Sequence, residues 1–195
     1  MMEILGEKAH RYLYGTLERA AERESAMTAD AMAKVDDIVG AYTNAERRKW
    51  QERNIPWFEG EMISKENILA MALNLGNEIN RSRLAEGLSD MQHNHPIEEI
   101  IARVEQHMEE KDWQFVQSIW DFLGTYWPET VRIEMVMNGT VLHAQPALPF
   151  TVQTKTGKEI KMKGGYYPIV YNAMKNMKAM EQTIDEAAKR NMVGA

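Results

Sequence analysis

The chain has 195 residues, of which 44% are hydrophobic and 27% are charged, a composition typical of a folded globular protein rather than a disordered segment. Its length allows one sizeable core or two small ones. The net charge of −6 argues against nucleic-acid binding through a broad basic face, and the absence of cysteine excludes disulfides, thiolate metal sites and cysteine nucleophiles.

No stretch of the sequence approaches the roughly 20 uncharged apolar residues that a membrane-spanning helix needs. The acidic start, from Met1 to Glu7, lacks the basic region of a signal peptide. We therefore expect a protein that is not directed to secretion by a signal peptide.

Residues 1–40 are expected to form one long helix, because apolar residues recur every three or four positions up to a glycine that can end it. A second, strongly charged helix is expected over 43–53 and ends before Pro56. These N-terminal helices, residues 1–60, are a candidate for a separate arm. Residues 61–195 are expected to form a helical core.

Three helices follow in the expected core. Ser64 is a suitable N-cap for the first, which Gly76 closes, and a short helix follows over 77–86. Pro96 opens the most regular amphipathic helix of the chain. Its apolar residues are Ile97, Ile100, Ile101, Val104 and Met108.

Asp112 begins a helix rich in aromatic residues, which is expected to anchor the hydrophobic core. Its apolar stripe repeats every three or four residues. The stripe comprises Trp113, Val116, Ile119, Trp120, Leu123 and Trp127. Pro128 is expected to kink or restart this helix, which then continues as far as Gly139.

After Gly139 the periodicity changes from helical to extended. A β-hairpin is expected over about 150–163, with a loop at 155–158 in which Gly157 can adopt a positive φ. Asn172 then caps an expected C-terminal helix. The fold class is therefore mainly α, a helical bundle with one small β-hairpin and extended connections near its C-terminal third.

The glycine- and tyrosine-rich segment after the hairpin is the first candidate for a contact surface. Two adjacent glycines, three tyrosines and a proline make a poor helix and indicate a fixed backbone path. The candidate surface comprises Tyr166, Tyr167 and Tyr171 together with Lys155, Lys158, Lys161 and Lys163. The alternative is that the tyrosines clamp the hairpin onto the helices.

Further polar residues surround the break at Gly76. Asn77 and Arg81 lie four positions apart and thus on one face of a helix. The favoured interpretation is that such side chains fix the angle between two helices, and the alternative is that they bind a ligand.

Catalytic motifs are absent from the sequence, which contains no nucleophile elbow, phosphate loop, dinucleotide fingerprint or zinc-protease helix. His93 and His95 have a spacing too unspecific to predict a metal site. Gly164 and Gly165 lack the Lys-Ser/Thr of a phosphate loop. We expect no catalytic residue, metal or cofactor; a metal- or nucleotide-dependent enzyme, based on these two pairs, is the least favoured alternative.

Three segments carry a family resemblance: Ala72–Arg81, Asp112–Asp121 continuing through Tyr126–Glu129, and Gly164–Pro168 with Tyr171. In this order and spacing they resemble a helical region in the large polyvalent proteins of tailed phages and prophages. Those are giant multidomain chains, thought to be packaged in the virion and delivered into the host with the DNA.

The resemblance implies a non-enzymatic interaction or structural protein, either a virion or DNA-ejection component or a domain of one. The alternative is a small phage-encoded inhibitor that binds a host protein or nucleoprotein defence complex, since this chain is short where the family's are giant. Both interpretations imply a protein partner and a location in the virion or the host cytoplasm. Homo-oligomers are compatible with either, and direct nucleic-acid binding is not expected.

Overall fold

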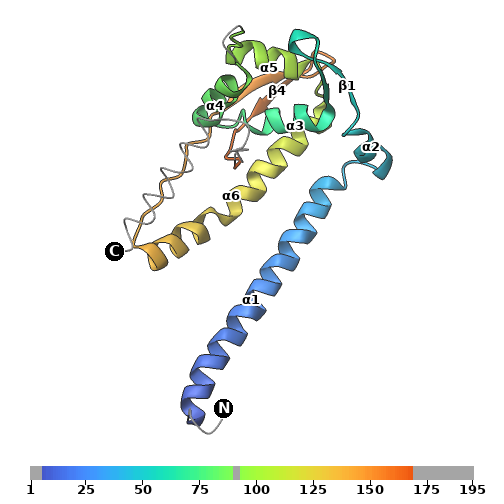
Figure 1. Ribbon diagram of the computed structural model, residues 1–195. Coiled ribbons are helices and arrows are strands. Elements are labelled where there is room, and N and C mark those ends of the chain that lie inside the picture. Colours follow the sequence, from blue (N-terminus) through green and yellow to red (C-terminus); the bar gives the residue numbers. More distant parts are fainter. Residues whose placement is uncertain (1–5, 90–92, 169–195) are drawn as a thin grey trace.

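The computed structural model describes residues 6–89 and 93–168, with residues 7–13 described by their backbone only. This part of the chain is mainly α-helical, which confirms the expected fold class (Figure 1). The predicted C-terminal helix from Asn172, and Tyr171 before it, lie outside the described residues.

The described chain contains six α-helices. They are α1 (Glu7–Val39), α2 (Asn44–Lys49), α3 (Lys65–Leu73), α4 (Glu78–Leu88), α5 (Ile97–Glu105) and α6 (Glu110–Asn138). Helix α6 runs without interruption through Pro128, so it does not restart there.

Two small antiparallel sheets accompany these helices. The predicted hairpin is present as β3 (Phe150–Gln153) and β4 (Glu159–Met162), with Gly157 at a φ of 82° in its loop. A second pair, β1 (Arg53–Pro56) and β2 (Met62–Ser64), was not predicted. The short helix η1 (Phe58–Gly60) separates its strands, and the aromatic residues around it conceal the alternation by which a strand is recognised.

Side-chain caps explain where several helices begin. The Thr43 hydroxyl accepts a hydrogen bond from the backbone N–H of Glu46 at the start of α2, and Ser64 does the same with Asn67 at the start of α3. Asn77 caps α4 by accepting from the backbone N–H of Asn80 at 2.9 Å. Capping residues of this kind can be recognised in the sequence, as Ser64 was.

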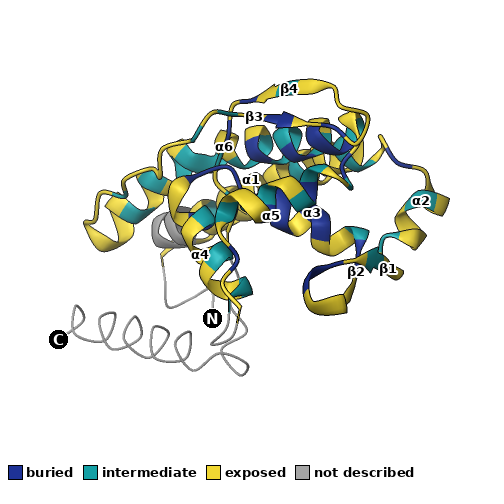
Figure 2. Ribbon diagram, turned by 90° about the horizontal axis from the view of Figure 1, so that it is seen from above, coloured by how far each residue is buried: buried dark blue, intermediate teal, exposed yellow. Residues whose placement is uncertain are grey.

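The hydrophobic core lies where α3, α5 and α6 meet the β3–β4 hairpin (Figure 2). Trp113 and Trp120 of α6 are buried there, together with Ile100, Val104 and Met108 at or just after α5, which confirms the expected centre. Trp127 is only partly buried and does not join this core, because α6 has by then left the body of the protein.

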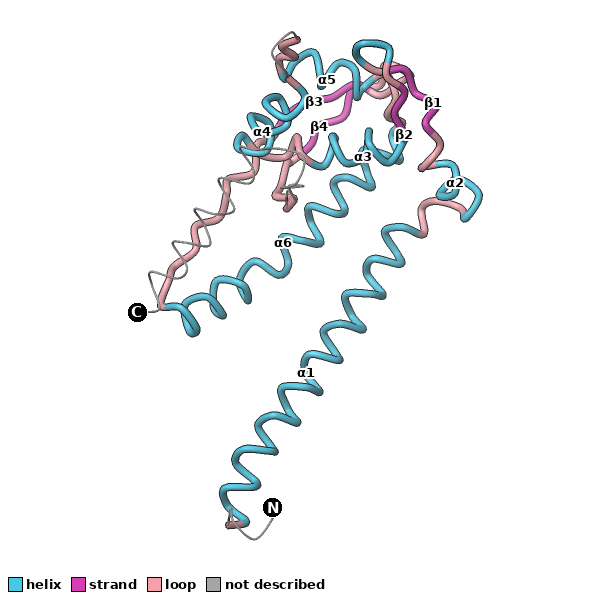
Figure 3. The backbone as a smooth tube through the Cα atoms, viewed as in Figure 1, coloured by secondary structure: helices cyan, strands magenta, loops and turns pink. Residues whose placement is uncertain are grey.

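Helix α1 projects from this body as a long rod, and its N-terminal end lies far from the sheets (Figure 3). Nearly all of its described side chains are exposed. None of the described helices, α1 included, is both long and apolar enough to span a membrane.

A close backbone crossing fixes the segment that follows the hairpin. The carbonyl of Gly76 accepts hydrogen bonds from the backbone N–H groups of Leu148 and Gly165, both at 2.9 Å. A Cβ atom on Gly165 would lie 2.6 Å from Cγ of Trp120, and one on Gly76 would lie 2.7 Å from Cε2 of the same indole. Glycine is therefore required at both positions for steric reasons.

We predict that Gly165→Ala lowers the free energy of unfolding by about 2–3 kcal/mol, because the added methyl group overlaps Trp120. The matched control is Gly124→Ala within α6, where an added Cβ meets nothing within 4 Å. The control should raise the free energy of unfolding by about 0.5–1 kcal/mol. Urea denaturation of both variants measures the difference, and equal effects would refute the steric constraint.

Candidate functional site

The glycine–tyrosine segment lies against the junction between α3 and α4 and is held there by its backbone. The buried amide of Asn77 donates to the carbonyl of Gly165 at 3.3 Å, and that of Asn80 donates to the carbonyl of Tyr167 at 2.7 Å. The ring of Tyr167 packs against the core, whereas the side chain of Tyr166 is 45% exposed. The two tyrosines thus have different surroundings, and Tyr166 is the one open to a partner.

Arg81 connects the same junction to the hairpin. Its Nε donates to the carbonyl of Leu75 at 2.8 Å, and its guanidinium lies 4.3 Å from the centre of the Phe150 ring. Burial lowers the pKa of this guanidinium. Arg81 and Asn77 therefore both make contacts that join neighbouring elements, as the angle-fixing interpretation expects.

The candidate lysines lie along the hairpin and the segment after it. The Nζ of Lys158 lies 2.6 Å from the carboxylate of Glu110, and that of Lys163 lies 3.5 Å from Asp121, both on α6. Lys155 and Lys161 are also exposed. Two of the four cations in this surface thus have carboxylate neighbours, which weakens the positive field that a partner would meet.

His95 is buried, in contrast to the exposed His93. Its ring stacks on Phe58 with centroids 4.0 Å apart, and its Nε2 lies 3.1 Å from the carboxylate of Glu59. The His93 ring centroid is 6.4 Å away. Within residues 6–89 and 93–168, no group of three or more His, Cys, Asp or Glu side chains is arranged to hold a metal ion. His95 joins the turn between β1 and β2 to the start of α5.

A cavity of about 250 Å³, lined by charged, polar and aromatic side chains, lies where the α1–α2 connection meets the start of α6. Its lining residues are Tyr42, Glu46, Lys49, Trp50, Asn54, Lys65, Glu109, Lys111 and Asp112. None of these residues was predicted as a site residue, because in the sequence the ionisable ones look like ordinary exposed charges at helix ends.

Asp112 is the buried centre of this cavity. Its Oδ1 accepts a hydrogen bond from the Tyr42 hydroxyl at 2.7 Å, and its Oδ2 pairs with the ammonium group of Lys65. Lys65 also donates to the carbonyl of His107 at 2.7 Å. Burial raises the pKa of the Tyr42 hydroxyl, and the bond to Asp112 raises it further. The network ties the α1–α2 connection, the start of α3 and the start of α6 together.

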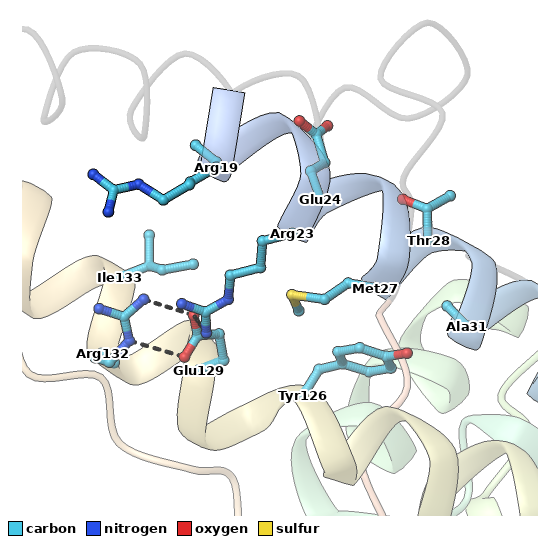
Figure 4. Close-up of a pocket in the computed structure, with 11 residues that line it drawn as sticks. Arg19, Arg23, Glu24, Met27, Thr28, Ala31, Tyr126, Glu129, Arg132 and Ile133 are labelled. Atoms are coloured by element: carbon cyan, nitrogen blue, oxygen red, sulfur yellow. Dashed lines mark hydrogen bonds and ion pairs between the residues drawn. The ribbon is translucent and has the colours of Figure 1, made fainter. Parts of the chain in front are cut away.

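A more open groove of about 660 Å³ runs between α1 and α6 (Figure 4). Both helices contribute to its apolar lining, which combines small side chains of α1 with large ones of α1 and α6. The residues are Ala20, Met27 and Ala31 of α1 with Tyr126 and Ile133 of α6. The sequence shows Met27 and Ala31 as part of a helical stripe but contains no signal that pairs them with α6.

One ionic cluster connects the two walls of this groove. Arg23 reaches from α1 to the carboxylate of Glu129 on α6 at 3.2 Å (Figure 4). Arg132 donates to the same carboxylate at 2.6 and 2.8 Å, and these bonds lower the pKa of Glu129. With Arg19 and Glu24 included, the lining carries three arginines and two glutamates.

Comparisons with known proteins found no family model, no curated protein and no solved structure that matches this chain.

We predict that Asp112→Ala lowers the free energy of unfolding by about 3–5 kcal/mol, because it leaves Lys65 and the Tyr42 hydroxyl without their buried partner. The matched control is Asp121→Ala on the same helix, whose half-exposed carboxylate contacts Lys163 and Gln117 at the surface. The control should change stability by less than about 0.5 kcal/mol. Urea denaturation of both variants measures these changes. An effect of Asp112→Ala as small as that of the control would contradict the structural role of the network.

We predict that the pKa of Glu46 is about 2, because its carboxylate accepts hydrogen bonds from Lys111 and from the backbone and side chain of Thr43. Since this pKa is depressed, the ionised carboxylate stabilises the folded chain above its ordinary pKa. That contribution is lost as the pH falls towards 2. Carboxyl titration by NMR measures the value, which should rise in Lys111→Ala and stay low in Lys49→Ala.

Proposed function

We propose that this protein is a non-enzymatic interaction protein of phage or prophage origin that binds a partner protein in the groove between α1 and α6. The groove itself carries the proposal. Two helices, α1 and α6, present apolar side chains to it, and the pair between Arg23 and Glu129 connects its walls. Exposed concave apolar surface of this kind is typical of protein-binding sites.

The chemistry of the groove favours an amphipathic helix with acidic residues as the bound segment. Met27, Tyr126 and Ile133 offer the apolar contact. The three arginines exceed the two glutamates of the lining by one charge, so a carboxylate on the partner is attracted. Helix-in-groove recognition uses this combination of an apolar face and charged edges.

The buried polar groups of the body form hydrogen bonds within the fold, and this supports a binding function over a catalytic one. Asp112, Asn77 and Asn80 each form hydrogen bonds that join elements of the fold. Such groups hold the framework from which α1 and α6 project. The exposed Tyr166 and the neighbouring lysines remain a second candidate contact surface.

The biological setting follows from the resemblance of three segments to polyvalent phage proteins. In that setting the protein acts in the virion or, after DNA delivery, in the host cytoplasm. Its partner is another virion protein or a host protein.

The second candidate function is an inhibitor that binds a host protein or nucleoprotein defence complex. The observation that favours it is the acidic C-terminal half of α1, where Glu24, Asp36 and Asp37 are exposed. Carboxylates on a rod compete with nucleic acid for basic surfaces. The partner's identity separates the two functions.

We predict that Met27→Glu and Ile133→Glu, on opposite walls of the groove, each weaken partner binding at least about tenfold, or about 1.4 kcal/mol. The matched control is Met137→Glu, an apolar residue of α6 that is 76% exposed and does not line the groove. The experiment combines affinity capture with the wild-type chain, identification of the captured protein and calorimetry on the purified pair. A partner whose affinity is unchanged by both groove variants would refute the proposed site.

A further inference from the structure

The groove between α1 and α6 differs in chemistry from one end to the other. Ala31 and Tyr126 lie towards one end, and three arginines gather towards the other (Figure 4). They are Arg19, Arg23 and Arg132. Because Arg23 and Arg132 share the carboxylate of Glu129, the basic end keeps an excess of positive charge. A helix bound in the groove therefore meets different surroundings along its length.

Residues 169–195, which we call the C-terminal segment, lie outside the described residues. Their sequence predicts an amphipathic helix that starts at Asn172. Five apolar residues share one face of this helix, within an arc of about 120°. They are Met174, Met177, Met180, Ile184 and Ala188. Glu181 and Asp185 follow one edge of that face, next to Lys178. The predicted helix thus has the apolar face and acidic edge that the groove favours.

We propose that the C-terminal segment occupies the groove of its own chain, antiparallel to α1, and so competes with the partner protein. This inference rests on the proposed function, because it concerns the regulation of the same groove. The lengths agree. Ala20 and Ala31 lie about 16 Å apart along α1, and Met174 and Ile184 lie about 15 Å apart along the predicted helix.

The described chain brings the C-terminal segment close to the groove. Gly165 lies against Trp120, and Tyr126 follows about 9 Å further along α6 and a third of a turn round it. The nine residue steps from Gly165 to Met174 span up to roughly 30 Å. The tether is therefore long enough for Met174 to reach the Tyr126 end of the groove. A short tether also gives the segment an effective concentration on the order of millimolar.

Charge complementarity selects the direction of the segment. When its first apolar residue lies level with Ala31, Glu181 follows after about 10 Å and Arg23 after about 12 Å. Asp185 and Arg19 follow at about 16 and 18 Å. Each carboxylate then lies close to the level of an arginine, and unlike charges of this kind fix the register of two surfaces.

The opposite direction loses these pairs. When the first apolar residue lies level with Ala20, Lys178 comes within about 2 Å of the level of Arg23, a like charge. Glu181 then lies level with Met27, which is apolar. Juxtaposed like charges disfavour this arrangement. We therefore expect the segment to run antiparallel to α1.

Occupation of the groove by the segment lowers the partner's apparent affinity in proportion to the fraction of chains whose groove is free. A segment that fills the groove in nine of ten chains lowers that affinity about tenfold. Ile184→Glu places a charge on the apolar face of the segment and should release it. This variant should therefore bind the partner up to about tenfold more tightly, whereas the groove variants bind it more weakly.

Spin-label distances in the full chain test the proposal without any partner. Because the chain has no cysteine, Glu18→Cys and Glu186→Cys introduce the two labelling sites. Glu18 is exposed and does not line the groove, and Glu186 falls on the polar face of the predicted helix. In the proposed arrangement these residues are level, with their backbones about 10 Å apart. We expect one short distance, which an excess of unlabelled chain leaves unchanged.

Two variants of the doubly labelled chain should abolish the short distance. They are Ile184→Glu in the segment and Met27→Glu on the wall of the groove. The matched control is Gln182→Glu, which adds the same charge to the polar face of the predicted helix. It should keep the short distance.

A long distance in the labelled chain, or a short one that persists in either variant, would overturn the proposal. Loss of the short distance on adding unlabelled chain would show exchange between copies and overturn the intramolecular form. Partner affinity unchanged by Ile184→Glu would overturn the competition. Failure of the proposed function is distinguishable, because it appears as partner binding that neither Met27→Glu nor Ile133→Glu changes, whatever the label distance.

Discussion

The architecture depends on the backbone crossing at Gly76. Its carbonyl accepts two hydrogen bonds, one from the segment before β3 and one from Gly165 after β4. The indole of Trp120 lies against both glycines and donates its N–H to the carbonyl of Leu73 at 2.9 Å. One aromatic side chain and one carbonyl thereby hold α3, α6 and both ends of the hairpin at a fixed separation. Any side chain at either glycine would force these elements apart.

This compact body supports two long helices that contribute little to its core. Helix α6 begins inside the core with Trp113 and leaves it after Trp120, whereas α1 is joined to the body near Tyr42 and Asp112. The ionic cluster at Glu129 connects the two helices beyond the core. Such a division separates the part of the molecule that holds the core from the part that leaves most surface exposed. The proposed partner binding depends on this exposed, elongated part.

Features that depend on residues close together in the sequence were predicted, whereas features that depend on distant residues were missed. The helix starts at Ser64 and Asn77 and the β3–β4 loop at Gly157 depend on residues within four positions of one another, so a local pattern predicts them. The β1–β2 pair was missed, because its strands are three and four residues long and aromatic residues lie between them. Trp127 continues the aromatic stripe of α6 yet lies outside the core, since the period of a helix does not reveal where its neighbours end.

The sequence alone determined the helical character of the chain and the positions of several helix caps and of the hairpin, because these follow from local backbone preferences. The tertiary structure decided the need for glycine at Gly165, where Trp120 leaves no room for a side chain, and it decided which polar residues are buried and which surfaces lie open. Asp112 is an ordinary first-turn carboxylate in sequence, and it becomes a buried hydrogen-bond centre only because Tyr42 and Lys65 approach it from 70 and 47 residues away. The groove between α1 and α6 likewise depends on a pairing of distant helices, which helical periodicity does not specify.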